Sequence, residues 1–334
     1  MKDNEVSCCV GKLNDRKESP GLYMLKALCA LFVVIYHVPL YMGRELTPVT
    51  GTAVPCFYMI SGYFLFSGDA EKELKRAYSW LKKILIITIL INVFYLFVNY
   101  EQVVSNLSRS PGLVIPLFFQ GGVVAPHLWY LCAFWEALIV FIILRKYFSQ
   151  KLLYVAPVLI FVSLCASKYS FLFGEYKCAG WLCQSFLAPA IPCLSTGYLV
   201  RKYVNCFARK GIWWILTIMF LLLIYTERYL LAVYENVHDD GSYYLFTLPL
   251  AMCFFVVALK MKRAMPLIVS IGKYHSSNVY FFHLFVAGCI ASLFVSYMGR
   301  SYYFITALVV YIISILFSIA IRWGYKKIMP FFLE

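Results

Sequence analysis

Long apolar runs alternate with short polar segments along almost the whole chain. The hydrocarbon core of a bilayer is about 30 Å thick, and a helix needs about 20 mostly apolar residues to cross it. The pattern therefore predicts an all-α protein, a polytopic transmembrane helical bundle of about ten spans. The expected spans cover residues 21–41, 50–68, 84–100, 127–144, 152–167, 181–200, 212–231, 243–259, 276–297 and 302–321.

Composition agrees with this interpretation. Of the 334 residues, 62% are hydrophobic and 14% are charged. Soluble chains average about 45–50% apolar residues and about 25% charged residues. We therefore expect a cytoplasmic N-terminal tail (1–20), a ten-helix transmembrane domain (21–322) and a cytoplasmic C-terminal tail (323–334). The first apolar run lacks a small-residue cleavage site, so it is expected to be a retained helix rather than a signal peptide.

The distribution of positive charge predicts the topology. The 30 Lys and Arg residues fall in short clusters between apolar runs rather than on one basic surface, which argues against a nucleic-acid partner. Cytoplasmic loops accumulate Lys and Arg. With ten spans, 23 basic residues lie on one side, Lys26 lies within the first span, and six lie on the other side: Arg44, Arg109, Lys168, Lys177, Arg228 and Arg300. Both termini are therefore predicted to be cytoplasmic.

Four ionisable side chains are expected inside spans: Lys26, His37, Glu136 and His283. Burying such a group costs a few kcal/mol, roughly 2.5–3.5 on insertion scales, so each is a functional candidate. Lys26 and His37 are 11 residues apart, about 20° from the same helical face and about 16–17 Å apart along the axis. The alternatives are a Lys26 that reaches the headgroups, a His37 bonded to a neighbouring helix, and a structural bond for Glu136, seven residues after Trp129.

The twelve cysteines show neither paired CxxC spacing nor metal-ligand spacing. They lie mostly within apolar runs, so we expect them to be small buried hydrophobic residues, and we expect no metal.

Four short segments resemble the acyltransferase-3 family of membrane acyltransferases. The first is LKALCALFVVIYH (25–37), and the others are VPCFYMISGYFL (54–65), HLWYL (127–131) and NVYFFH (278–283). Their order and spacing cover nearly the whole chain. The family plan of ten helices with a cytoplasmic N-terminus is similar to the topology expected from charge.

The resemblance implies an O-acyltransferase of the cell (cytoplasmic or inner) membrane. Its donor would be cytoplasmic acyl-CoA, with acetyl-CoA expected, and its acceptor a hydroxyl of an extracytoplasmic glycan or lipid-linked sugar, as in polysaccharide O-acetylation. The resemblance also implies that His37 acts on the acceptor hydroxyl as a base, for which a neutral imidazole is suited. Glu136 and His283 are the other catalytic candidates. The expected partners are the bilayer, the donor and the acceptor.

Further residues are expected to bind the two substrates. Lys26 stands where the family commonly has Arg, which keeps the charge but loses the planar fork. Lys26, Lys75 and Arg76 are expected to bind the donor, and the acceptor candidates are Tyr36, Ser61, Tyr63, His127, Trp129 and Tyr130. The alternatives are that the basic residues only satisfy the topology bias, that Ser61 bonds its own helix, and that the aromatic residues form an interfacial belt. Gly62 is expected to permit a close helix contact.

A second function class also fits the pattern. A carrier or flippase that moves a glycan or small solute without acyl chemistry also places charged residues within the membrane. A third class, a receptor or scaffold, is not supported, because the pattern predicts no extramembrane domain. The shared face of Lys26 and His37 favours the enzyme, because it suits a donor that enters from the cytoplasm.

Overall fold

A computed structural model describes residues 19–38, 43–113, 122–148, 151–174, 180–207, 210–239, 241–261, 263–294 and 303–328. Every regular element within these ranges is helical, and none is a strand. The prediction of an all-helical fold is confirmed. The predicted N-terminal tail, apart from its last two residues, and residues 329–334 of the predicted C-terminal tail lie outside the described residues.

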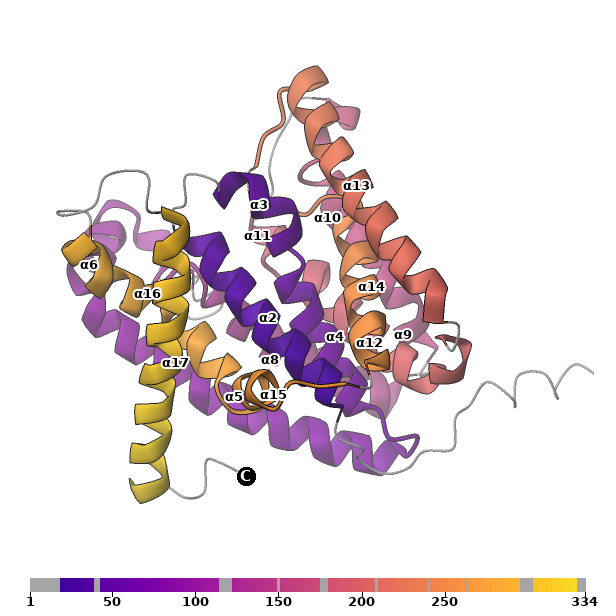
Figure 1. The fold of residues 1–334 in the computed structure, drawn as a ribbon, viewed down its shortest axis with the longest axis horizontal. Helices are drawn as coiled ribbons and strands as arrows, with labels where there is room; N and C mark the ends of the chain where they lie inside the picture. The colour runs from indigo at the N-terminus through magenta and orange to yellow at the C-terminus, as the bar shows by residue number, and fades with distance from the viewer. Residues whose placement is uncertain are drawn as a thin grey trace, which may run out of the picture. The chain divides into compact units, whose positions relative to one another are not determined.

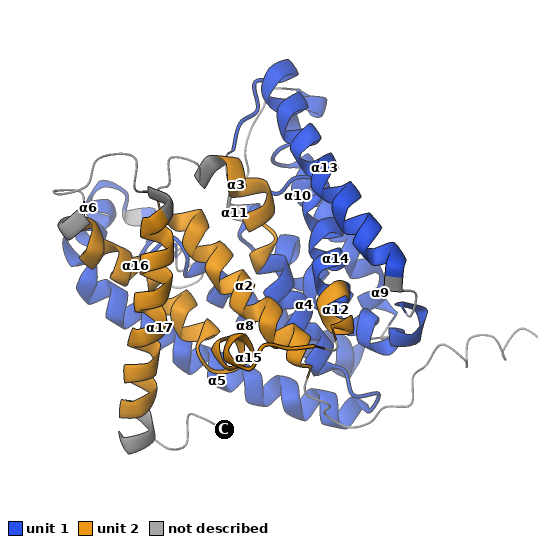
Figure 2. Cartoon of the chain, in the orientation of Figure 1, with its two compact units in different colours: residues 1–18, 54–256 blue, residues 19–53, 257–334 orange. Residues whose placement is uncertain are grey.

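The chain divides into two compact units (Figure 2). Unit 1 comprises residues 1–18 and 54–256, and unit 2 comprises residues 19–53 and 257–334. The first described helix thus belongs with the last helices of the chain. The sequence pattern did not indicate this division, because it is set by contacts between segments that are distant along the chain.

Unit 2 is built around α2 (Pro20–His37), shown in indigo in Figure 1. The α2 helix contacts α3 (Gly43–Thr50), α15 (Pro266–Tyr274), α16 (Ser276–Phe294) and α17 (Tyr303–Ile328). Half of the residues in its most apolar window are buried, against 22% in α17. The helix that carries Lys26 and His37 is therefore the central helix of this unit. The α17 helix continues beyond residue 322, where the transmembrane domain was expected to end.

Unit 1 contains most of the remaining helices. The principal ones are α4 (Ala53–Leu65), α5 (Ala70–Val98), α6 (Tyr100–Arg109), α8 (Trp129–Tyr147), α12 (Ile191–Lys202), α13 (Lys210–Tyr234) and α14 (Thr247–Lys260). Ala53 and the last turn of α14 belong to unit 2. Shorter pieces connect them: η1 (Pro111–Leu113), α9 (Leu152–Val155), η2 (Ala156–Val158), α10 (Leu159–Cys165), η3 (Ser170–Phe173), α11 (Gly180–Cys183), the π-helical η4 (Phe186–Ala190) and η5 (Val204–Phe207).

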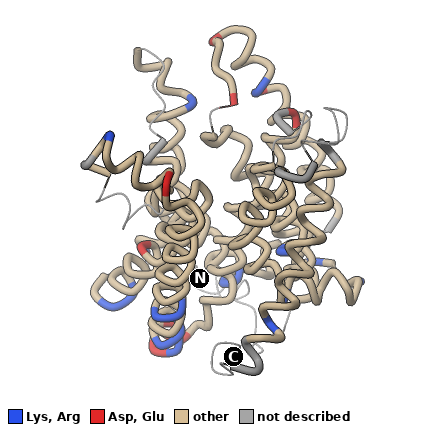
Figure 3. The backbone as a smooth tube through the Cα atoms, turned by 90° about the vertical axis from the view of Figure 1, so that its left-hand side faces the viewer, with Lys and Arg blue, Asp and Glu red and all other residues tan. Residues whose placement is uncertain are grey.

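Several helices are suited to lipid. By length and composition, four described segments can cross a membrane: Pro20–His37, Ala70–Val98, Gly211–Tyr234 and Ile305–Gly324. Shorter apolar helices cover Leu152–Cys165, Thr247–Lys260 and Ser276–Ala291. Large apolar side chains on these helices are exposed, as with Phe97 and Ile215 at 79% and 67%, and such surfaces mark membrane contact. Figure 3 shows long uncharged stretches of helix between the Lys, Arg, Asp and Glu positions. The chain is a multi-pass membrane protein, while ten spans and the side of each terminus stay predictions.

The basic segment before the third apolar run is helical, although a loop was expected there. The α5 helix begins at Ala70, because the Asp69 side chain caps it by accepting from the backbone N–H groups of Glu71 (2.9 Å) and Lys72 (3.4 Å). The residues that follow are strong helix formers. Short helices α3, α6 and α15 were likewise not predicted, because a search for long apolar runs does not detect them.

Glycines lie at close contacts between helices in both units. A Cβ on Gly62 would lie 1.9 Å from the Leu194 carbonyl oxygen, and one on Gly197 would lie 1.8 Å from that of Met59. The α4 and α12 backbones therefore touch, which confirms the prediction for Gly62. In unit 2, a Cβ on Gly272 would lie 1.7 Å from the Tyr23 carbonyl oxygen.

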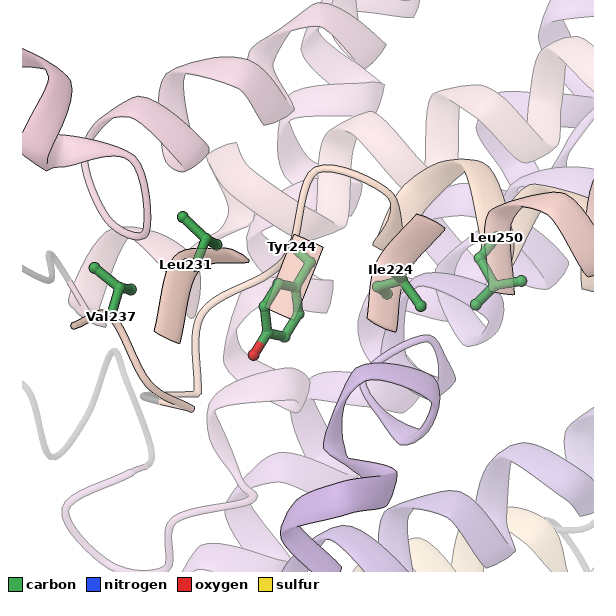
Figure 4. Close-up of a cluster of buried hydrophobic side chains, with 5 residues drawn as sticks. All are labelled: Ile224, Leu231, Val237, Tyr244 and Leu250. Carbon is green, nitrogen blue, oxygen red and sulfur yellow. The ribbon is translucent and has the colours of Figure 1, made fainter. Parts of the chain in front are cut away.

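The α13–α14 connection in unit 1 is packed rather than loose. Figure 4 shows its buried cluster of Ile224, Leu231, Val237, Tyr244 and Leu250. The buried Glu227 carboxylate accepts from the Tyr169 hydroxyl and from the backbone N–H groups of Leu245 (2.7 Å) and Phe246 (3.2 Å). Burial raises the pKa of Tyr169, so its hydroxyl keeps its proton and donates. These bonds stabilise the connection against α13.

Nine cysteines lie in the described part of the chain, and none of these nine is in a disulfide. Six are buried, as expected, and Cys165, Cys206 and Cys289 are exposed. The prediction is wrong for these three. Cys165 and Cys289 lie in apolar runs, where the sequence does not distinguish a lipid-facing position from a buried one, and Cys206 lies in a polar segment between two expected spans.

Candidate functional site

Two histidines from opposite ends of the sequence meet in unit 2. The ring centres of His37 and His283 are 5.3 Å apart, with an angle of 41° between the ring planes. His283 lies in α16 and is fully buried, whereas His37 is the last residue of α2 and is half-buried. The pair forms because α2 and α16 pack against each other.

A backbone contact determines the tautomer of His283. Its Nδ1 lies 2.8 Å from the Tyr280 carbonyl oxygen. A carbonyl oxygen can only accept, so Nδ1 carries the proton, and in a neutral ring Nε2 is the basic nitrogen. The Tyr280 ring also lies beside that of His283, with centres 6.1 Å apart. The His283 ring is thus held in one orientation.

The end of α2 leaves His37 near a surface. Val38 is extended (φ −80°, ψ 121°) and its N–H bonds the Val34 carbonyl oxygen. The next residue in the sequence is Pro39, which disfavours helical backbone at the residue before it. Tyr36 is 39% exposed and packs edge-on against His37, with ring centres 5.2 Å apart. Its exposure is compatible with a substrate contact.

Lys26 lies three turns before His37 on the same helix. The α2 helix is continuous from Pro20 to His37, so the expected geometry holds: one face, with a separation of about 16–17 Å along the axis. Lys26 is half-buried. Its donor role and its alternative role in reaching the headgroups both stay predictions.

Tyr63 and Arg76 are held by other groups of unit 1. The buried Tyr63 hydroxyl accepts from Arg201 Nη1 at 2.7 Å, and the Arg201 guanidinium lies over its ring, 4.8 Å from the centre. Arg76 donates to the carbonyl oxygens of Phe64 and Leu65 (3.2 Å for the latter), at the end of α4. Arg76 therefore caps a helix C-terminus, a position where a cation is stabilised.

Ser61 and Tyr130 lie in a region rich in aromatic residues. The Ser61 hydroxyl donates to the Phe57 carbonyl oxygen at 2.9 Å, one turn earlier in its own helix. The Tyr130 ring centre is 4.7 Å from that of Tyr58 and 5.9 Å from that of Phe134, and the Tyr58 hydroxyl donates to the Tyr130 carbonyl oxygen at 3.1 Å. Tyr130 itself is half-buried, so part of it stays accessible.

The other candidates of unit 1 differ in exposure. His127 is 1% exposed and packs edge-on against Tyr95, with ring centres 5.0 Å apart. Trp129 and Glu136 are half-buried on α8, and Lys75 is exposed on α5. Of the predicted site residues, Lys26, Tyr36, His37 and His283 belong to unit 2, and the others belong to unit 1.

A buried carboxylate in unit 1 was not predicted. Glu73 is fully buried and pairs with Arg145 (Nε–Oε2, 2.8 Å), and it accepts from the Tyr198 hydroxyl at 3.0 Å. It also accepts from the backbone N–H groups of Ser67 and Gly68, both at 3.0 Å. An acidic residue between Lys72 and Lys75 was the available signal, but its side-chain partners Arg145 and Tyr198 come from distant helices.

Metal-ligating side chains do not gather in the described part of the chain: no three His, Cys, Asp or Glu residues there are placed to hold an ion. The expectation of metal-free chemistry stays a prediction.

The helices and the histidine pair define a multi-pass membrane protein with a candidate acid–base site. Residues 20–323 match the model of an acyltransferase domain, and the chain belongs to the acyltransferase-3 family. It is also similar to an amino-acid racemase of Enterococcus faecalis, with 25% identity over 295 residues, which cover 78% of this chain and 39% of that relative. The match thus spans about two fifths of the relative's length. No solved structure matches.

Proposed function

We propose that this membrane acyltransferase transfers an acyl group, acetyl in the first instance, from cytoplasmic acyl-CoA to a hydroxyl of an extracytoplasmic glycan or lipid-linked sugar in the cell membrane. The observation that carries the proposal is the contact between His37 and His283 in a chain of this family. A base is what a hydroxyl needs before it can attack a thioester.

In the proposed reaction, the acceptor hydroxyl oxygen attacks the thioester carbonyl carbon while His37 takes the hydroxyl proton. The carbon–sulfur bond then breaks. The thiolate of coenzyme A leaves and takes up a proton, so the products are an ester and a free thiol. Because Nδ1 of His283 is committed to the Tyr280 carbonyl oxygen, the other nitrogen of that ring can stabilise a protonated His37.

Lys26 would hold the donor's phosphates as a point charge. Coenzyme A is an elongated molecule with phosphates at one end and the thioester at the other. A single helix face with a cation at one end and an imidazole about 16–17 Å away along the axis suits such a donor. Lys75 and Arg76 are proposed as further donor contacts, and Tyr36, Ser61, Tyr63, His127, Trp129 and Tyr130 as acceptor contacts.

Two measurements test the function. Purified protein given acetyl-CoA should release free thiol, and should do so faster with a hydroxylated sugar acceptor. Mass spectrometry of surface glycans from cells with and without the gene should show an acyl mass that depends on the gene. Protein that inserts normally but neither hydrolyses nor exchanges acyl-CoA would contradict the proposal and favour a carrier.

A further inference from the structure

Cationic and aromatic side chains alternate in a row across unit 2, near the beginning of α2. The Lys273 Nζ atom lies 5.7 Å from the ring centre of Tyr23 and 5.2 Å from that of Tyr274. The Arg322 guanidinium carbon lies 4.3 Å from the ring centre of Tyr274. Both distances for Tyr274 fall within the range of cation–π attraction. The row, defined as Tyr23, Lys273, Tyr274 and Arg322, combines residues of α2, α15 and α17.

Hydrogen bonds beside the row hold α15 and α16 against α17. His275 Nδ1 lies 2.9 Å from the Ser318 hydroxyl oxygen, and Asn278 Nδ2 donates to the same oxygen at 3.0 Å. Ser318 precedes Arg322 by one helical turn, and His275 directly follows Tyr274. These contacts hold the segments that carry Arg322 and Tyr274 next to each other. The side chains of the row therefore have defined neighbours within the fold.

The sequence of unit 2 supplies almost no negative charge to balance these cations. It contains ten basic residues and two acidic ones, Glu45 and Glu334. Glu45 lies on α3, which follows the His37 end of α2, and Glu334 is outside the described residues. Grouped cations with little counter-charge attract anions to that part of a surface. The row is therefore suited to an anionic ligand.

We propose that Lys273 and Arg322 bind the phosphates of the acyl donor, with Tyr23 and Tyr274 flanking them. This inference rests on the acyl-CoA donor proposed above and adds two cations that the sequence motifs did not indicate. Tyr23 is one turn before Lys26, so the row and Lys26 are at the same end of α2. His37 is at the other end. Phosphates bound by the row leave the thioester to extend along α2 toward the histidine pair.

The test compares two donors that differ in their phosphates. Acetyl-CoA carries them, and S-acetyl-pantetheine keeps the thioester and the arm but lacks them. Lys273→Gln and Arg322→Gln should each raise the KM for acetyl-CoA about tenfold, the loss of one charge-assisted contact. Neither variant should change the KM for S-acetyl-pantetheine. Arg322→Lys and Lys273→Arg should recover part of the affinity.

Arg263→Gln provides the matched control, because it removes one positive charge from an exposed position of the same unit. Equal effects from Arg263→Gln and Lys273→Gln would overturn the inference, since the effect would then be general electrostatic attraction. The affinity of the full-length protein for coenzyme A, measured in neutral phosphatidylcholine nanodiscs, should also fall in Lys273→Gln and Arg322→Gln. It should fall less in Arg263→Gln.

A lipid headgroup is the other source of phosphate. In nanodiscs that also contain phosphatidylglycerol, native mass spectrometry measures retained lipid. Variants that lose bound phosphatidylglycerol but keep wild-type affinity for coenzyme A would overturn the inference and leave acyl transfer intact. Wild-type protein that binds no coenzyme A and releases no thiol would instead overturn the proposed function together with this subsite.

Discussion

The ring centres of His37 and His283 lie 5.3 Å apart. His37 is at the end of α2, and His283 is two turns into α16. One ring is half-buried and the other is inaccessible. This asymmetry suggests a division of roles in which His37 meets the substrate and His283 supports it.

His37→Ala should abolish acyl transfer while the protein still inserts at normal abundance. Loss of a general base typically lowers the rate by about 10²–10⁴. The alanine methyl group is apolar, so the substitution should not impair insertion of α2 into the membrane. Thiol release from acetyl-CoA with acceptor present measures the effect, and abundance in the membrane fraction is the control. Full activity in this variant would remove the catalytic assignment, and a joint loss of abundance and activity would indicate a structural role.

His283→Ala should lower kcat by about tenfold or more, equivalent to about 1.4 kcal/mol, and should change the KM for acetyl-CoA little. The reason is that His283 contacts the His37 ring and lies far from the Lys26 end of α2. Steady-state kinetics at varied acetyl-CoA concentration separate the two parameters. An effect confined to KM would contradict the supporting role.

Lys26→Arg should retain activity, whereas Lys26→Ala should raise the KM for acetyl-CoA with a smaller effect on kcat. Charge is the property expected to matter at a phosphate, and Arg preserves it. The comparison uses the same thiol-release assay. If donor dependence in Lys26→Ala is unchanged, the side chain reaches the headgroups and does not bind the donor.

Gly272→Ala should destabilise unit 2, because the new Cβ would lie 1.7 Å from the Tyr23 carbonyl oxygen. Overpacking of this kind costs about 1–3 kcal/mol. Gly288→Ala on α16 is the matched control: nothing lies within 4 Å of its Cβ, so Ala should be neutral or slightly stabilising there. Thermal unfolding in detergent should separate the two variants, and equal midpoints would contradict the close α2–α15 contact.

Reporter tags at Gly68 and Gly241 should lie on opposite sides of the membrane, with Gly68 cytoplasmic. Both glycines are exposed in turns with positive φ, 80° and 83°, so insertions there disturb no helix interior. The bias of 23 basic residues to six motivates the prediction. Accessibility to a reagent that cannot cross the membrane provides the measurement, and two tags on one side would exclude the ten-span model.

The sequence by itself determined the helical class, the membrane setting and the single face shared by Lys26 and His37. These properties depend on local periodicity, because hydrogen bonds within a helix fix the relative direction of side chains along it. Gly62 was also predictable, since a small residue in a signature segment favours a close helix contact.

Only the tertiary structure decided which helices meet. The contact of His37 with His283, the burial of Glu73 against Arg145, and the row of Tyr23, Lys273, Tyr274 and Arg322 each join segments far apart along the chain. Hydropathy along a single chain does not distinguish a side chain that faces lipid from one that faces another helix, because both surroundings are apolar. Packing between helices makes that distinction, and it places the two histidines in contact.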